Sequence, residues 1–124
     1  MRLDSEGLQA LVTKVLGIHE DVRFAALFDS DGRKLGGGMR KGKRSLDPPK
    51  KSSQIDKASA LYPALLAANE RYFGKFGFMF AKMERCNAIV VQVEAEVFLV
   101  VTTDPPTGLD IIPEIEKVVG GRRR

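Results

Sequence analysis

The sequence contains little of what enzymatic and metal-binding sites need. Cys86 is the only cysteine among 124 residues, so neither an internal disulfide nor a multi-cysteine metal site can form. His19 is the only histidine, and nothing in the sequence places it beside Cys86, although a catalytic pair of the two stays an open alternative. We therefore predict a protein that is not an enzyme, with no catalytic, cofactor-binding or metal-binding residues.

Long hydrophobic runs are missing too. No apolar run approaches the ~20 residues that a membrane-spanning helix needs. Residues 1–6 carry acids where a signal peptide has basic residues ahead of an apolar stretch. We expect a cytoplasmic protein without a membrane span. The length suits a single domain over residues 1–124.

The net positive charge of the chain is concentrated in two segments. Residues 40–51 hold six Lys or Arg against one Asp, a local charge of +5, and residues 122–124 add +3. Subtracting both from the net charge of +4 leaves −4 for the rest of the chain. The body of the protein is therefore acidic, and its basic charge is confined to one loop and one tail.

Five short apolar segments predict strands. Those at 78–83, 88–93 and 97–103 are joined by segments too short for a crossover, so they must be antiparallel neighbours. An earlier pair, at 22–29 and 33–37, is connected by a turn rich in Asp and Gly. The segments at 22–29, 88–93 and 97–103 are apolar on nearly both faces, which indicates interior strands. The segments at 33–37 and 78–83 have the polarity of edge strands.

Helical periodicity precedes, separates and follows these strands, over residues 3–16, 53–73 and 109–119. Pro63 interrupts the second helix at a cost of ~3 kcal/mol, so we expect a kink or a fresh start there. The fold class is α/β (α+β): a three-layer α/β/α sandwich with a five-stranded antiparallel sheet and the order helix-strand-strand-helix-strand-strand-strand-helix. The strands at 22–29 and 96–103 should lie at its centre, with helix 53–73 on one face and both terminal helices on the other.

The segment 38–53 is basic and rich in Gly, Ser and Pro, so we expect a mobile loop, with a second basic segment in the tail at 120–124. Residues 36–38 are all glycine but lack the spacing of a phosphate-binding loop. The candidate partner-binding residues of the loop are Arg40, Lys41, Lys43, Arg44, Lys50 and Lys51. A solvated loop without a partner is the open alternative.

Aromatic residues gather where the 53–73 helix meets the 76–84 strand. Core packing alone is one explanation, but an interface is favoured, because an aromatic strand edge left in water would invite uncontrolled pairing, which dimerisation prevents. The predicted dimer interface therefore comprises Leu61, Leu65, Tyr72, Phe76, Phe78 and Phe80.

The element order, with an apolar strand that ends in the turn Asp29-Ser30-Asp31-Gly32, resembles the roadblock / dynein light chain domain family over roughly residues 4–119. The resemblance implies a non-enzymatic domain that pairs through its long helix and third strand, joining two sheets. Many members of that family act on small Ras-like GTPases. The basic loop is longer than the connection usual in the family, and Pro63 lies in the helix that would carry the dimer contact.

We expect a homodimeric interaction or scaffold domain that binds a small GTPase or another acidic protein partner. The alternative is a nucleic-acid-binding module that uses the 40–51 loop and the Arg-rich tail, with contacts to the backbone only, because no aromatic residue is interleaved in the loop. A third possibility, a small-ligand sensor, would need a sizeable pocket beneath the long helix, and the apolar density of the sheet argues against one.

Overall fold

The computed structural model describes residues 4–46 and 52–120 of the chain. Lys50, Lys51 and the tail residues Arg122–Arg124 lie outside the described residues. The elements are α1 (Ser5–Leu16), β1 (Val22–Asp29), β2 (Lys34–Met39), α2 (Ser52–Ala68), α3 (Glu70–Phe73), β3 (Phe78–Lys82), β4 (Asn87–Glu94), β5 (Val97–Thr103), a 3-10 turn (Leu109–Ile111) and α4 (Ile112–Val119).

The five strands form one antiparallel sheet in the order β2-β1-β5-β4-β3. This confirms β1 and β5 as the central pair, joined from Val22 opposite Thr103 to Asp29 opposite Val97, with a register shift between Val22 and Phe24. It also confirms β2 and β3 as the two edges of the sheet. Side chains alternate along a strand, so the two-sided apolar sequences of β1, β4 and β5 supply a core to each face.

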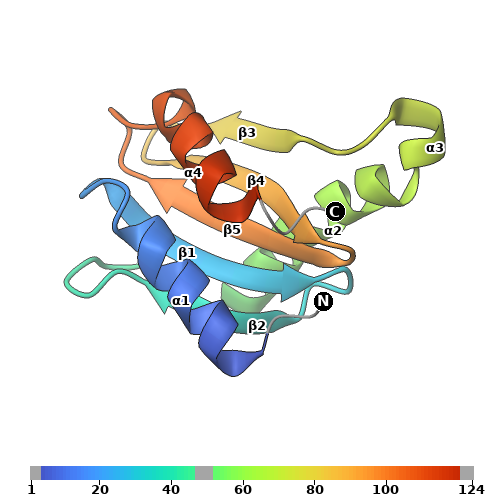
Figure 1. The fold of residues 1–124 in the computed structure, drawn as a ribbon. Coiled ribbons are helices and arrows are strands. Elements are labelled where there is room, and N and C mark those ends of the chain that lie inside the picture. Colours follow the sequence, from blue (N-terminus) through green and yellow to red (C-terminus); the bar gives the residue numbers. More distant parts are fainter. Residues whose placement is uncertain (1–3, 47–51, 121–124) are drawn as a thin grey trace.

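Helices cover both faces, as the predicted sandwich requires (Figure 1). The larger core lies under α1 and α4, and its buried residues are Leu11, Val12, Val15, Val22, Ala25, Leu27, Ile89, Val91, Val93, Leu99, Val101, Ile111, Ile112, Ile115 and Val119. The smaller core lies on the α2 face, and its buried residues are Ala26, Phe28, Val90, Phe98 and Val100. Ala64 and Ala67 of α2 pack against this second core, whose helical cover is thinner.

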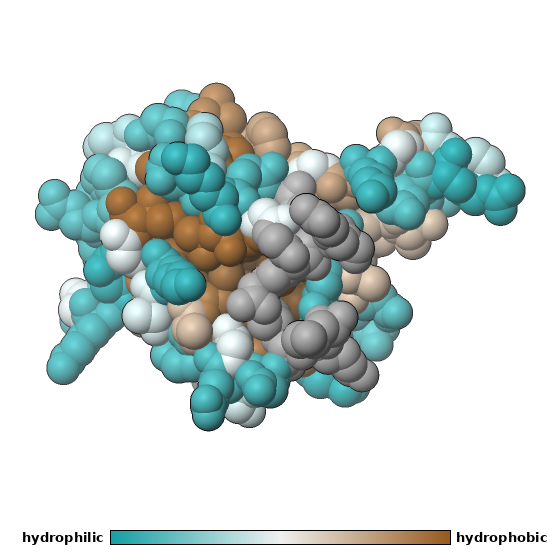
Figure 2. All heavy atoms as spheres, viewed as in Figure 1, coloured by the Kyte–Doolittle hydropathy of each residue, from teal (hydrophilic) through white to brown (hydrophobic). Residues whose placement is uncertain are grey.

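Figure 2 looks onto the face that carries α1 and α4. Hydrophobic residues are visible between the two helices, and hydrophilic side chains surround them. Leu8 and Leu16 of α1 and Val118 of α4 are the partly buried residues that the helices add to the rim of the larger core. Asp4 caps α1, because its carboxylate Oδ1 accepts the backbone N–H of Gly7 at 2.8 Å.

The predicted 53–73 helix is two helices, and the break is not at the proline. α2 continues through Pro63, and the chain leaves the helical path at Asn69, whose φ and ψ are −109° and 28°. Pro63 is buried, so the loss of one backbone hydrogen bond is accompanied by burial of its apolar ring. The amide Nδ2 of Asn69 donates to the carbonyl of Leu65 at 2.8 Å and so satisfies part of the α2 end. A fresh start of the helix at residue 63 is therefore wrong, because the second helix begins at Glu70.

The loop expected from residue 38 begins later than predicted. β2 runs to Met39, and the N–H of Arg40 still donates to the carbonyl of Arg23 at 2.7 Å. Positive φ at Gly37 and Gly38 lets the edge strand keep this ladder despite its irregular path. Glycine here serves strand geometry, so a glycine-rich sequence did not mark the end of the strand.

Candidate functional site

Exposed apolar side chains are found on α2 and α3 and beside the open edge of β3. We call this set of residues the apolar surface, in which Phe78 faces the α1 and α4 side of the sheet and the other residues belong to α2 and α3: Leu61, Tyr62, Leu65, Tyr72, Phe73 and Phe78. Leu65 and Tyr62 are each 58% exposed, and Tyr72 and Phe73 are each 72% exposed. α3 and the end of α2 extend beyond the sheet (Figure 1).

β3 provides the backbone part of this surface. Among the described strands it pairs with β4 alone, from Phe78 opposite Val91 to Lys82 opposite Asn87. The outer edge of β3 therefore presents unpaired backbone donors and acceptors. Such an edge can accept a further strand by main-chain hydrogen bonding.

The structure divides the six predicted interface residues into two groups. Leu61, Leu65, Tyr72 and Phe78 are exposed. Phe76 and Phe80 instead take part in the protomer's own packing. The Phe76 ring meets Phe98 edge-on at a centroid distance of 6.3 Å, and Phe80 packs against the larger core.

Phe78 and Phe80 point to the same face of β3, so strand alternation alone does not separate them. The difference is the segment after β5, because Gly108 lies against the Phe80 ring: a Cβ at Gly108 would be 3.0 Å from a ring carbon. Phe78, by contrast, is 47% exposed. Sequence reasoning also missed Tyr62, although its helical spacing of three residues from Leu65 could have identified it.

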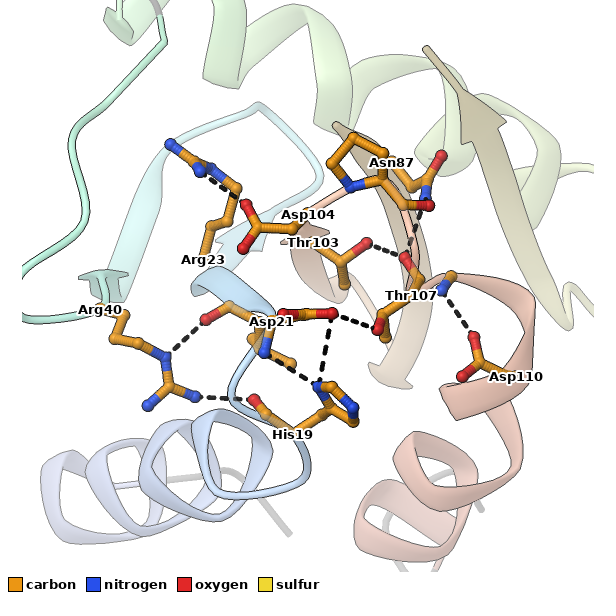
Figure 3. A network of polar contacts seen from close by, with 12 residues as sticks. His19, Asp21, Arg23, Arg40, Asn87, Thr103, Asp104, Thr107 and Asp110 are labelled. Carbon is orange, nitrogen blue, oxygen red and sulfur yellow. Dashed lines mark hydrogen bonds and ion pairs between the residues drawn. The ribbon is translucent and has the colours of Figure 1, made fainter. Parts of the chain in front are cut away.

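A second surface starts at the end of β2 and is anchored by an arginine. The guanidinium of Arg40 donates to the backbone carbonyls of Val22 at 2.7 Å, His19 at 2.9 Å and Leu16. These carbonyls belong to the end of α1 and the connection to β1 (Figure 3). Arg40 therefore fastens the beginning of the predicted loop to the body of the protein, through hydrogen bonds from Nε and Nη2.

Asp104, directly after β5, holds two further cations. Its Oδ1 accepts from Nη1 of Arg23 at 2.7 Å, and its Oδ2 accepts from Nζ of Lys43 at 2.6 Å. Nη2 of Arg23 also donates to the carbonyl of Arg44. The hydrogen bonds from Lys43 and then Arg23 lower the pKa of Asp104 below its ordinary value. The carboxylate is thus kept ionised between two positive groups.

The same end of the sheet contains a polar network that fixes the segment after β5 (Figure 3). The hydroxyl of Thr107 donates to Oδ2 of Asp21 at 2.6 Å, and the amide of Asn87 donates to the Thr107 carbonyl at 2.8 Å. Nδ1 of His19 accepts the N–H of Asp21 at 2.9 Å. These contacts hold the start of β1, the start of β4 and the end of β5 together.

The two residues that could have formed a catalytic pair have other surroundings. Nδ1 of His19 is engaged with the backbone of Asp21. Cys86 is half-buried, and burial raises the pKa of its thiol, with a smaller opposing effect of Arg23. A raised thiol pKa makes a poor nucleophile. In the described part of the chain, no three His, Cys, Asp or Glu side chains come together as a metal site would require.

The predicted basic residues therefore differ in what they can offer a partner. Arg40 and Lys43 are bonded within the chain, whereas Lys41 and Arg44 are exposed. Within residues 4–46 and 52–120, neither Lys41 nor Arg44 forms an ion pair. No helix in those ranges is long and apolar enough to cross a bilayer.

Comparisons with known proteins match the fold at low sequence identity. MglB, the gliding protein of Thermus thermophilus, has 18% identity and a TM-score of 0.71 over 90% of this chain and 82% of its own. MglB in a tetrameric arrangement has 20% identity and a TM-score of 0.73 over 92% and 82%. A Roadblock/LC7 domain of Streptomyces avermitilis has 16% identity and a TM-score of 0.63 over 92% of each chain.

No protein-family model and no curated protein matches this sequence. The resemblance seen in the element order therefore rests on architecture, and there the agreement extends over nine-tenths of the chain. The sheet order, the flanking helices and these structures together confirm the sequence-based resemblance: by fold, the chain is a roadblock-like domain.

Proposed function

We propose that this domain is a non-enzymatic, self-associating interaction module that presents its joined surface to a protein partner, a small Ras-like GTPase. The observation that carries the proposal is the apolar surface beside the open edge of β3. Leu61, Leu65 and Phe78 are 43%, 58% and 47% exposed in the protomer. Burying a Leu or Phe side chain completely contributes roughly 1.5–3 kcal/mol.

A twofold dimer suits this surface, because β3 can pair with the β3 of a second copy and α2 can pack against the α2 of that copy. An isologous interface uses the same patch on each subunit. Antiparallel pairing of β3 with a second β3 would continue the sheet, and α2 would then lie against the α2 of the partner. Leu61 and Leu65 lie one helical turn apart on α2, so they would form the apolar centre of that contact.

One of the solved structures of the same fold supports self-association. It is MglB in a tetrameric arrangement. The roadblock resemblance supports the GTPase as partner, because many members of that family act on small Ras-like GTPases. The basic loop supplies positive charge that would steer an acidic protein toward the domain.

We predict that Leu65→Asp converts the dimer to a monomer, because a carboxylate at the centre of an apolar interface loses its hydration. Light scattering across a concentration series measures the change in mass. Leu109→Asp is a matched control, since Leu109 is also 58% exposed but follows β5, outside the apolar surface. A native chain that stays monomeric at tens of micromolar would refute the self-association.

We predict that the native chain binds a small Ras-like GTPase in one nucleotide state more tightly than in the other. The measurement is a titration with GTPases encoded in the same genome, loaded with GDP or with a non-hydrolysable GTP analogue. The bound nucleotide changes the switch loops of a GTPase, so a partner that contacts these loops binds one nucleotide state more tightly than the other. Absence of binding in both states would remove the GTPase and leave the dimer unaffected.

A further inference from the structure

Residues 40–44 form a held turn, which we call the basic turn. The N–H of Lys43 donates to the carbonyl of Arg40 at 3.0 Å, and Gly42 between them has a φ of 90°. Three anchors fix it: the Arg40 guanidinium on the end of α1, Lys43 on Asp104, and Arg23 on the Arg44 carbonyl. The start of the predicted mobile loop therefore has a defined shape.

The anchoring leaves the charge of the basic turn largely uncompensated. Arg40 bonds to neutral carbonyls, so its charge is not cancelled. Asp104 is the carboxylate that forms ion pairs with this region in the described residues, and it serves both Lys43 and Arg23. Lys41 and Arg44 are exposed on either side of the Lys43 anchor.

We propose that the basic turn is a preorganised docking site for an acidic segment of a protein partner. Lys41 and Arg44 contact carboxylates of the partner, and Asp104 is the positioning residue that sets their spacing. The inference rests on the proposed function, in that it locates where an acidic partner engages the domain. It goes beyond general charge steering, because it makes the binding of an acidic partner depend on Asp104, which has the same sign of charge as that partner.

The physical basis is the difference between a held and a loose set of cations. The side chains of Arg23, Asp104 and Lys43 are only 13%, 22% and 29% exposed, so this ion pair is shielded more than an ordinary surface pair. Without the carboxylate, Arg23 and Lys43 are like charges side by side and would repel each other. A partner would then have to order the turn as it binds, which lowers affinity.

The proposal reverses the sign expected from net charge. Asp104→Asn adds one positive charge, so simple attraction predicts tighter binding of an acidic ligand. A lost anchor predicts weaker binding. Asp31→Asn makes the same change of charge in the exposed turn after β1, where the carboxylate of Asp31 holds no cation in the described structure, and is the matched control.

The first arm of the test needs no partner. Limited trypsin digestion of the full chain, followed by mass spectrometry, measures cleavage after Lys41, Lys43 and Arg44. We expect Asp104→Asn to accelerate this cleavage several-fold, Asp104→Glu to restore protection in part, and Asp31→Asn to leave the rate unchanged. Equal rates in the native chain and Asp104→Asn would overturn the assignment of Asp104 as an anchor.

The second arm measures binding of a fluorescent oligoglutamate peptide by anisotropy at low and at physiological salt. We expect Asp104→Asn to weaken binding several-fold, with Asp104→Glu closer to native and Asp31→Asn equal or tighter. Replacement of Lys41 and Arg44 together by Gln should remove most of the binding and of its salt dependence. Tighter binding by Asp104→Asn would overturn the proposal.

Two further outcomes separate the inference from its premise. Single-stranded oligonucleotides that outcompete oligoglutamate at physiological salt would identify the turn as a nucleic-acid site and overturn the protein partner. Light scattering on the Lys41/Arg44 double variant should show the native mass, because the basic turn lies apart from the apolar surface. If the native chain proves monomeric yet binds oligoglutamate as described, the dimer fails and the docking site stands.

Discussion

At the scale of single residues, the structure assigns roles that composition does not reveal. Gly37 belongs to a run of three glycines, and the sequence suggests only a polar, irregular edge strand. In the structure its φ is 94°, and a Cβ there would overlap the carbonyl oxygen of Ala25 and lie 2.7 Å from the Cα of Ala26. The residue therefore meets both a conformational and a steric demand of the β1–β2 pairing.

We predict that Gly37→Ala lowers the free energy of unfolding by more than the roughly 1–2 kcal/mol that left-handed strain alone costs. The additional loss comes from the contact with the backbone of β1, which cannot move aside. Gly42→Ala is a control for the strain, since its φ is 90° and no atom lies within 4 Å of the new Cβ. Urea unfolding measures both variants, and equal losses would contradict a steric role for Gly37.

Asp104 also gives the fold a pH dependence with a defined sign. Lys43 and Arg23 lower its pKa in the folded state, so the folded pKa lies below the unfolded value of about 3.9. Its contribution to stability is present above the unfolded pKa and disappears as the pH falls through the folded pKa.

We expect native protein to exceed Asp104→Asn in unfolding free energy at neutral pH, and the gap to close in acid, below about pH 4. Urea titrations at a series of pH values measure that gap. High salt should reduce it at neutral pH, because the pair is partly exposed. A gap that persists unchanged into acid would show that the effect of Asn at this position does not come from the carboxylate charge.

At the scale of elements, the apolar pattern along each strand and the lengths of the turns predicted more of the fold than the helix-breaking tendency of proline did. The three interior strands were identifiable because residues such as Phe28, Val90 and Val100 supply the second face of the sheet. The end of the long helix was not identifiable from the sequence. A proline lowers helix stability locally, and whether the helix breaks there depends on tertiary packing. Pro63 is buried within α2, whereas Asn69 is the residue between α2 and α3.

The basic loop illustrates the same limit for contacts. Lys43 lies 61 residues from Asp104 in sequence, and Arg40 lies 24 residues from Leu16. Charge density along the chain predicted an exposed cationic segment, and Lys41 and Arg44 are exposed. Which cations are used within the protomer depends on strand order, because it brings the end of β5 beside the end of β2 through β1.

At the scale of the whole molecule, the layered architecture followed from the sequence almost completely. Strands that are apolar on both faces need helices on both faces of the sheet. The three predicted helices were enough for one on one face and two on the other. The candidate interface was predictable only in part. Phe76 and Phe80 have the same composition signal as Phe78, but Phe98 and Gly108 accommodate their rings within the protomer.

The position of Cys86, directly before β4, allows this end of the sheet to be followed chemically. Cys86 is the only thiol of the chain, and burial raises its pKa, with smaller effects of Arg23 and Asp104 in opposite directions. A small neutral alkylating reagent would modify the molecule at that one sulfur, at a speed set by the thiolate fraction. The native sequence thus carries its own chemical reporter beside the anchor of the basic turn, and no label needs to be introduced.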